Sequence, residues 1–185
     1  MLAIKSESSV GDPPQFISKF VTEKIANQLP NMPFKGFFSP NTCLIPVPKT
    51  TLMQPNTLWV SSKIAQEFSK RKLGVYCECL KRISPLPKAA FAPQGMRPSA
   101  HDHFQSLECQ LPLNKPTEIV LIDDIITRGA TLIGCANRIR ASLPNASIKA
   151  FAVMRTVSNP NDFKQIIDPC VGTIKNYSHG TFREP

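Results

Sequence analysis

Several signatures of common protein classes are missing from this chain of 185 residues. No apolar stretch approaches the length needed to span a bilayer, and residues 1–14 contain no apolar core of signal-peptide length. Neither the G-x-G-x-x-G nor the G-x-x-x-x-G-K-S/T motif of nucleotide-binding loops occurs. We find no internal repeat and no low-complexity segment. These absences predict a single globular domain, residues 1–185, with no membrane partner and a cytoplasmic location.

The six cysteines do not have the spacing of a structural zinc site. No C-x-x-C pair occurs, and the three histidines do not complete such a site. Cys77 and Cys79 flank Glu78 in a segment expected to be extended, so their side chains should point to one face. Disulfides would require a secretory context, so the sequence predicts buried free thiols.

The charge balance is basic, with 22 Lys and Arg against 13 Asp and Glu, a formal net charge of +9. This balance favours acidic ligands such as phosphorylated metabolites or nucleic acid. The basic residues are dispersed, apart from Lys70, Arg71 and Lys72 at the end of an expected helix, where they complement its dipole. Charge alone therefore permits nucleic-acid binding without establishing it.

Hydrophobic periodicity predicts alternating strands and helices. The expected strands cover residues 42–48, 75–80, 118–123, 147–154 and 170–175. The expected helices cover residues 15–29, 57–70, 129–143 and 159–167. Residues 81–105 form a long Pro-, Lys- and Arg-rich loop, and a loop of that length inside a domain is usually functional or disordered. The alternation predicts an α/β fold with a parallel sheet.

The most informative segment starts with four apolar residues, Ile119 to Ile122, which predict a strand buried on both faces. Asp123 and Asp124 follow at its carboxyl end, where open α/β sheets place their ligands. Residues 127–131 then offer backbone N–H groups, two hydroxyls and a helix N-terminus to an anion. A ribose 5-phosphate has the matching shape. The alternative is an ordinary buried strand before a capped helix, in which adjacent aspartates would be unfavourable without a ligand or metal.

This segment resembles the loop of type I phosphoribosyltransferases that binds 5-phosphoribosyl-1-pyrophosphate (PRPP). The resemblance implies that Asp123 and Asp124 hold the ribose 2′- and 3′-hydroxyls. It implies that the 5′-phosphate is wrapped by Thr127, Arg128, Gly129, Ala130 and Thr131. The implied fold is Rossmann-like, with a central parallel sheet flanked by helices, a small hood and a long flexible loop. The core would span residues about 42–176, and the hood residues 1–41 and parts of 84–112.

A second segment, Leu44 to Pro48, is similar to the "PVP" segment of the competence-protein ComF family. The resemblance implies that the turn after this strand approaches pyrophosphate through its backbone, at Pro48, Lys49 and Thr50. Leu80-Lys81-Arg82 resembles the Leu-x-Arg of the same family, and the loop after it resembles the flexible catalytic loop. In that loop, Lys88 and Arg97 are the candidates to neutralise the departing pyrophosphate; a solvated basic loop is the alternative.

Other candidate positions are less specific. Arg155, and with it Ile125, lies where related enzymes meet the incoming nucleophile, although a structural salt bridge of Arg155 is an alternative. His101, His103 and His179 are candidate bases, but we expect surface histidines. The tail, residues 176–185, could fold over the site. The chain also departs from the ComF pattern: it has no cysteine before Cys43, and no Arg-Gly-Phe-Asn after the "PVP" strand.

The resemblance as a whole implies a phosphoribosyltransferase that binds PRPP with Mg²⁺, mainly through PRPP itself and also through Asp123 and Asp124. The acceptor would be a nitrogen nucleophile, a base or a related molecule, and pyrophosphate would leave. The alternative is a non-catalytic PRPP-sensing or nucleic-acid-binding module of ComF type. The sequence does not fix the oligomeric state, although the resemblance is to a family whose members are often homodimers.

Overall fold

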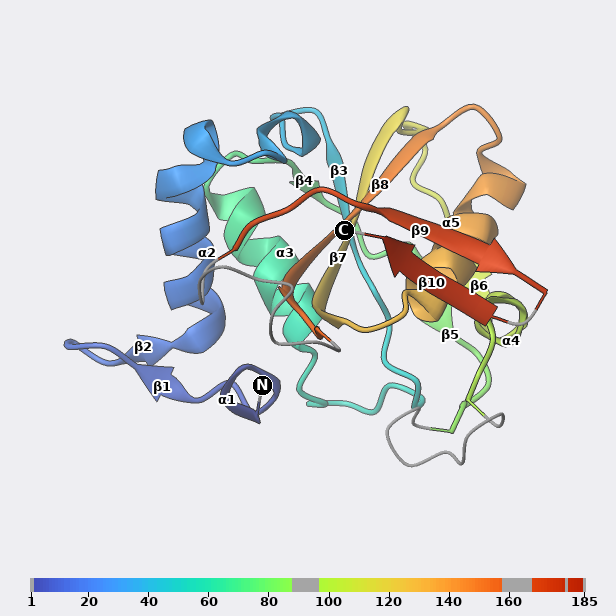
Figure 1. Cartoon of the computed structure of the whole chain (residues 1–185), viewed down its shortest axis with the longest axis horizontal. Helices are drawn as coiled ribbons and strands as arrows, with labels where there is room; N and C mark the ends of the chain where they lie inside the picture. Colours follow the sequence, from blue (N-terminus) through green and yellow to red (C-terminus); the bar gives the residue numbers. More distant parts are fainter. Residues whose placement is uncertain (1, 88–96, 158–167, 179, 185) are drawn as a thin grey trace.

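The centre of the molecule is a four-stranded parallel sheet with strand order β4-β3-β7-β8 (Figure 1). The computed structural model describes residues 2–87, 97–157, 168–178 and 180–184. The strands of the sheet are β3 (Cys43–Pro46), β4 (Val75–Tyr76), β7 (Glu118–Ile126) and β8 (Ser147–Arg155). The prediction of an α/β fold with a parallel sheet is confirmed, and the sheet is compatible with a Rossmann-like fold.

Helices cover both faces of this sheet. On one face lie α2 (Ile17–Gln28) and α3 (Val60–Lys70), with α3 directly against β3 and β7. On the other face lies α5 (Ala130–Ser142), and α4 (Ala100–Gln105) packs beside it (Figure 1). The sheet is therefore the middle of three layers, which explains why its strands are continuous apolar runs instead of alternating ones.

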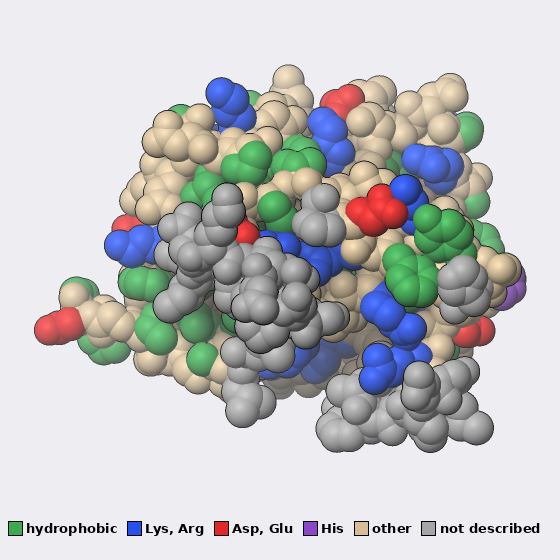
Figure 2. All heavy atoms as spheres, in the orientation of Figure 1, with side chains coloured by type: hydrophobic (Ala, Val, Ile, Leu, Met, Phe, Trp, Pro, Cys, Tyr) green, Lys and Arg blue, Asp and Glu red, His purple; other side chains and the backbone are tan. Residues whose placement is uncertain are grey.

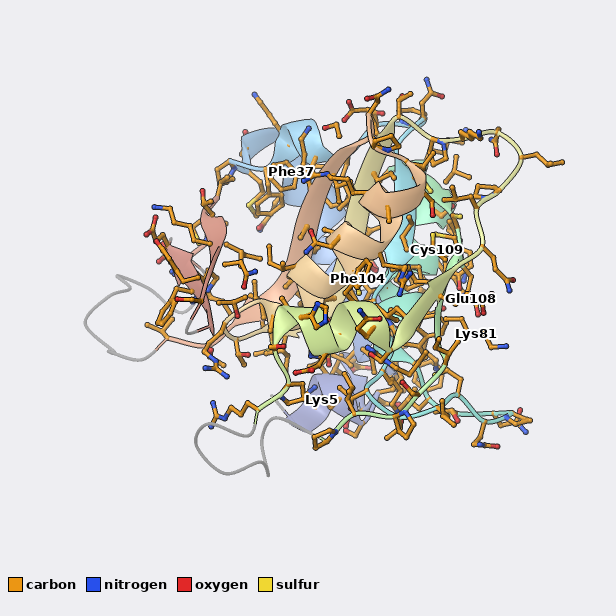
Figure 3. All side chains as sticks on the ribbon, turned by 90° about the vertical axis from the view of Figure 1, so that its right-hand side faces the viewer. Lys5, Phe37, Lys81, Phe104, Glu108 and Cys109 are labelled. Atoms are coloured by element: carbon orange, nitrogen blue, oxygen red, sulfur yellow. The ribbon has the colours of Figure 1, made fainter. Side chains whose placement is uncertain are left out.

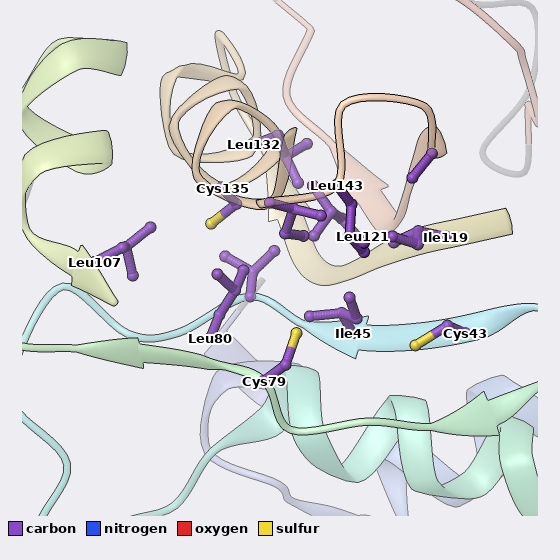
Figure 4. Close-up of a cluster of buried hydrophobic side chains, with 13 residues drawn as sticks. Cys43, Ile45, Cys79, Leu80, Leu107, Ile119, Leu121, Leu132, Cys135 and Leu143 are labelled. Carbon is purple, nitrogen blue, oxygen red and sulfur yellow. The ribbon is translucent and has the colours of Figure 1, made fainter. Parts of the chain in front are cut away.

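Alternate side chains of β7 enter two separate hydrophobic clusters. Ile119 and Leu121 pack on the α5 side with Ile45, Cys79 and Cys135, as Figure 4 shows. Val120 and Ile122 pack on the α3 side. The α3 side also holds a group of phenylalanines with ring centroids 5.1 to 5.5 Å apart: Phe34, Phe38, Phe68 and Phe151. Burial of both faces fixes the register of β7 and hence the position of the residues that follow it.

Smaller elements surround this core. The described residues form three antiparallel pairs: β1 (Ser9–Val10) with β2 (Gln15–Phe16), β5 (Leu80–Arg82) with β6 (Leu107–Cys109), and β9 (Thr173–Tyr177) with β10 (Gly180–Glu184). The remaining elements are α1 (Leu2–Lys5) and the 3₁₀ helices Leu29–Asn31 and Lys35–Phe37. Within the described ranges, no helix combines the length and the apolar character needed to cross a membrane.

The structure corrects three predicted elements. The strand expected over 75–80 is two short strands, β4 and β5, which belong to different sheets. After β4 the chain leaves the parallel sheet, and the Cys79 carbonyl accepts a hydrogen bond from Gln110 N–H beside β6. The last strand, expected in the parallel sheet, instead pairs with β10. The loop over 81–105 contains α4, which a capping box between Ser99 and Asp102 begins. The helix expected over 159–167 lies outside the described residues.

Candidate functional site

Asp123 and Asp124 lie near the carboxyl end of β7, as predicted, and three elements meet at their carboxylates. Ser61 Oγ, from the first turn of α3, donates to Asp123 Oδ1 at 3.2 Å. The backbone N–H of Asp124 donates to the same oxygen at 2.9 Å. Lys5 Nζ, at the end of α1, lies 3.1 Å from Asp124 Oδ2. The Asp pair is thus the meeting point of the sheet, of α3 and of the N-terminal segment.

The surroundings of Asp123 disfavour its negative charge. Burial, followed by the neighbouring Asp124 carboxylate, raises the pKa of Asp123 to about 7 from its ordinary value of 3.8. The hydrogen bonds from Ser61 and from the Asp124 backbone act in the opposite direction but are weaker. A ligand that brought hydroxyl donors or a cation to this carboxylate would favour the ionised form.

The loop after β7 leads into the N-terminus of α5. Thr127 and Arg128 are exposed, and Gly129 adopts a positive φ of 90° at the start of α5. A Cβ at position 129 would lie 2.7 Å from Ile174 Cγ2, so the position requires glycine for two reasons. No described side chain caps this helix end, so the N–H groups of its first turn point towards the loop. Such a helix N-terminus can bind a phosphate.

The turn after β3 lies next to β7, because Pro46 of β3 is in register with Ile122 and Val47 N–H donates to Ile122 O at 2.9 Å. Its backbone is held by three donors: Trp59 Nε1 to Val47 O at 2.8 Å, Arg82 Nε to Lys49 O at 2.9 Å, and Leu86 N to Thr50 O at 2.8 Å. Pro48 is buried, whereas the Lys49 side chain is exposed and donates to Leu58 O at 3.1 Å. The structure places residues 48–50 next to the strand end that carries the Asp pair.

The remaining predicted site residues are placed less closely. Arg97 is exposed, two residues before the cap of α4, and Lys88 lies outside the described residues. Arg155 forms a 2.7 Å ion pair with Asp168, which is the structural alternative raised for it. Ile125 is half-buried and in register with Met154 of β8.

A cavity of about 760 Å³ lies along β8. It is lined by Ile126 and Arg155 at the strand ends, and by Asp168, Ile174 and Arg183 from the C-terminal segment. The β9–β10 hairpin reaches the loop after β7 through Ile174, which precedes the tail at residues 176–185. Figure 2 shows Lys and Arg side chains gathered on the face that carries this hairpin.

Sequence reasoning missed several side chains that meet at the site. Lys5 and Ser61 carry no local signal, because only the packing of α1 and α3 brings them to the Asp pair. His103 was expected on the surface, and that expectation is wrong: it is 3% exposed. The Ser99–Asp102 capping box could have indicated the helix that buries it. His101 is exposed as expected, and His179 lies outside the described residues.

The described residues contain no cluster of three or more metal-ligating side chains. Asp123 and Asp124 offer carboxylate oxygens, the ligand type that Mg²⁺ prefers. Two carboxylates fit a metal whose other ligands come from substrate and water. Comparison of the chain with protein-family models and with curated proteins finds no match in either case.

Proposed function

We propose that this protein is a phosphoribosyltransferase of type I fold that binds PRPP and Mg²⁺ and transfers the phosphoribosyl group to a nitrogen nucleophile. One observation carries the proposal. Two adjacent carboxylates lie near the carboxyl end of a parallel strand, and a loop with a positive-φ glycine leads from that strand to an uncapped helix N-terminus. Carboxylates that can accept hydrogen bonds from ribose hydroxyls thus lie close in the chain to a loop that can bind a phosphate. The four-stranded parallel sheet with helices on both faces is compatible with this fold.

The ribose and its 5′-phosphate occupy the loop after β7 in this proposal. Asp123 and Asp124 accept hydrogen bonds from the 2′- and 3′-hydroxyls, and the hydroxyls replace the interaction that Lys5 makes with Asp124. The backbone N–H groups of residues 127–131 and the hydroxyls of Thr127 and Thr131 surround the phosphate. The partial positive charge of the α5 N-terminus favours the same anion.

Pyrophosphate lies against the turn at Pro48, Lys49 and Thr50. The three backbone hydrogen bonds at this turn fix its position before the ligand arrives, which reduces the entropy lost on binding. Lys49, whose exposed ammonium donates to Leu58 O, supplies positive charge there. Arg97 and Lys88 are the further candidates to neutralise pyrophosphate.

The transfer breaks the bond between ribose C1 and the pyrophosphate oxygen, and the lone pair of the acceptor nitrogen forms the new bond to C1. Positive charge develops on the ribose ring between the two events, and the Asp123 and Asp124 carboxylates stabilise it from nearby. Bound Mg²⁺ would neutralise charge on the pyrophosphate leaving group. Arg155, at the end of β8, is the candidate to orient the acceptor.

Isothermal titration calorimetry with PRPP and Mg²⁺ tests the binding step. We expect micromolar binding by the wild-type protein and its loss in the double variant Asp123→Asn/Asp124→Asn. Glu118→Gln is the matched control, because Glu118 is an exposed carboxylate at the opposite end of the same strand. Absence of binding by the wild type, or equal loss in the control, would contradict the proposal.

Release of pyrophosphate from PRPP, measured with purine and pyrimidine bases as acceptors, tests turnover. Binding of PRPP without release by any acceptor would favour the non-catalytic PRPP-sensing alternative. If PRPP does not bind, the net charge of +9 makes DNA and RNA the next ligands to test.

A further inference from the structure

Arg82, in β5, is an unusual buried charge. Its side chain is 2% exposed, and in the described part of the chain no carboxylate lies within ion-pair distance of its guanidinium. Burial lowers the pKa of Arg82, although arginine stays protonated in proteins. A buried charge normally has an ionic partner, because leaving water is otherwise strongly unfavourable. The position of Arg82 therefore calls for a reason beyond packing.

The hydrogen bonds of Arg82 run to backbone and hydroxyl groups on two sides. Arg82 Nε donates to Lys49 O at 2.9 Å, in the turn after β3. Its Nη1 atom donates to His103 O at 3.5 Å and to Ser106 Oγ, both from the α4 region. Its Nη2 atom is buried and has no partner among the described residues. Arg82 thus connects the turn after β3 to α4.

His103 continues this connection to the loop after β7. Its Nε2 atom lies 3.2 Å from Thr131 Oγ1, at the start of α5. Burial, followed by the nearby Arg82 charge, lowers the pKa of His103 to about 4, so the imidazole is neutral at pH 7. Helices α4 and α5 pack closely at this point: a Cβ added to Gly134 of α5 would lie 2.4 Å from His103 Cβ. Hydrogen bonds therefore run from Lys49 O through the Arg82 side chain to the His103 carbonyl, and the His103 ring continues the connection to Thr131 Oγ1.

The α4–α5 interface has a second arginine, which serves as a comparison. Arg138 donates twice to Phe104 O, at 3.2 and 2.8 Å, and its guanidinium lies 4.1 Å from the Phe104 ring centroid. Figure 3 shows Phe104 between α4 and α5. Among the described contacts, Arg138 bonds neither to the turn after β3 nor to the loop after β7. Arg138 therefore holds the two helices together without touching either segment of the candidate site.

We propose that Arg82 and His103 are positioning residues that couple the turn at residues 48–50 to the loop at residues 127–131. Arg82 positions the turn for a pyrophosphate, and His103 positions the loop for a 5′-phosphate. This inference rests on the proposed function. Arg82 fixes the Lys49 carbonyl and so turns the adjacent backbone towards the leaving group. Its charge also has a natural counterpart in an anion bound at that turn. His103 fixes the Thr131 hydroxyl by a neutral hydrogen bond.

Two ligands separate these roles, because PRPP carries both anionic groups and ribose 5-phosphate lacks the pyrophosphate. Calorimetry with each ligand is done on the wild type and on Arg82→Met, Arg82→Lys, His103→Asn and Arg138→Met. We expect Arg82→Met to weaken PRPP binding about tenfold, equivalent to about 1.4 kcal/mol, with ribose 5-phosphate changed less than about twofold. Arg82→Lys should recover part of the PRPP affinity, since it restores the charge. His103→Asn should weaken both ligands by the same factor.

The outcomes distinguish this inference from the proposed function. Absence of PRPP binding by the wild type would overturn both. Wild-type binding with unchanged PRPP affinity in a folded Arg82→Met protein would overturn the positioning role alone. Equal weakening in Arg138→Met and Arg82→Met would also overturn it, because both would then act through the α4–α5 packing. If Arg82→Met does not fold, Arg82→Lys and Ser106→Ala carry the test: unchanged PRPP affinity in both overturns the role, and a selective loss supports it.

Discussion

The substitution Asp123→Asn should stabilise the free protein while it weakens PRPP binding. Asparagine keeps the shape of the side chain and still accepts hydrogen bonds from Ser61 Oγ and from the Asp124 backbone N–H. It removes the charge that burial and Asp124 disfavour. Groups that are arranged for a ligand and not for stability give this combination of effects.

The magnitude follows from the pKa of Asp123, about 7 in the folded protein against an ordinary 3.8. Between these values the folded state binds more protons than the unfolded state, so the contribution of Asp123 to stability is full below pH 3.8 and is lost as the pH rises to about 7. The full difference corresponds to roughly 4 kcal/mol above pH 8. Because the Asp123 side chain is partly exposed, solvent screening reduces the expected gain in Asp123→Asn to about 2 kcal/mol.

The assay is urea unfolding followed by circular dichroism, at pH 5 and pH 8, for the wild type, Asp123→Asn and the control Glu118→Gln. The stability advantage of Asp123→Asn should be large at pH 8 and small at pH 5. The control should stay within about 0.5 kcal/mol of the wild type at both values. An Asp123→Asn protein that is less stable than the wild type at pH 8, or equally more stable at both pH values, would refute the electrostatic reasoning.

Three further predictions concern other parts of the molecule. Because the pKa of His103 is lowered to about 4 from 6.5, its contribution to stability, about 3 kcal/mol, is lost as the pH falls through this range. In urea unfolding, the decrease in the free energy of unfolding between pH 7 and pH 4.5 should be smaller for His103→Asn than for the wild type. An equal decrease in both proteins would contradict this. Phe151→Ala removes a ring packed against three other phenylalanines and should lower the free energy of unfolding by about 3–5 kcal/mol. A change below about 1 kcal/mol in urea unfolding would show that the cluster collapses to fill the space. Cys77 and Cys109 are half-buried, and hydrogen bonds from neighbouring thiols lower the pKa of each. In iodoacetamide labelling followed by mass spectrometry, both should react before the buried thiols. Faster labelling of the buried Cys135 would contradict this.

Local sequence patterns were sufficient for the parts of the fold that depend on neighbouring residues. The apolar run Ile119 to Ile122 predicted a strand buried on both faces, because only a covered parallel strand accepts such a run. The positive φ of Gly129 agrees with the glycine that the motif places there. The strand over 75–80 was predicted wrongly, since its split between two sheets depends on β6, about 30 residues later in the chain.

The sequence by itself determined the α/β class, the buried strand that carries Asp123 and Asp124, and the loop that follows it. These features depend on periodicity and on backbone preferences that act over a few residues. Only the tertiary structure decided which distant groups meet there: Lys5 and Ser61 at the Asp pair, and Arg82 and His103 between the two loops. Those contacts join residues far apart in the chain. They follow from how helices pack on the sheet, a property of the whole core that no local pattern encodes.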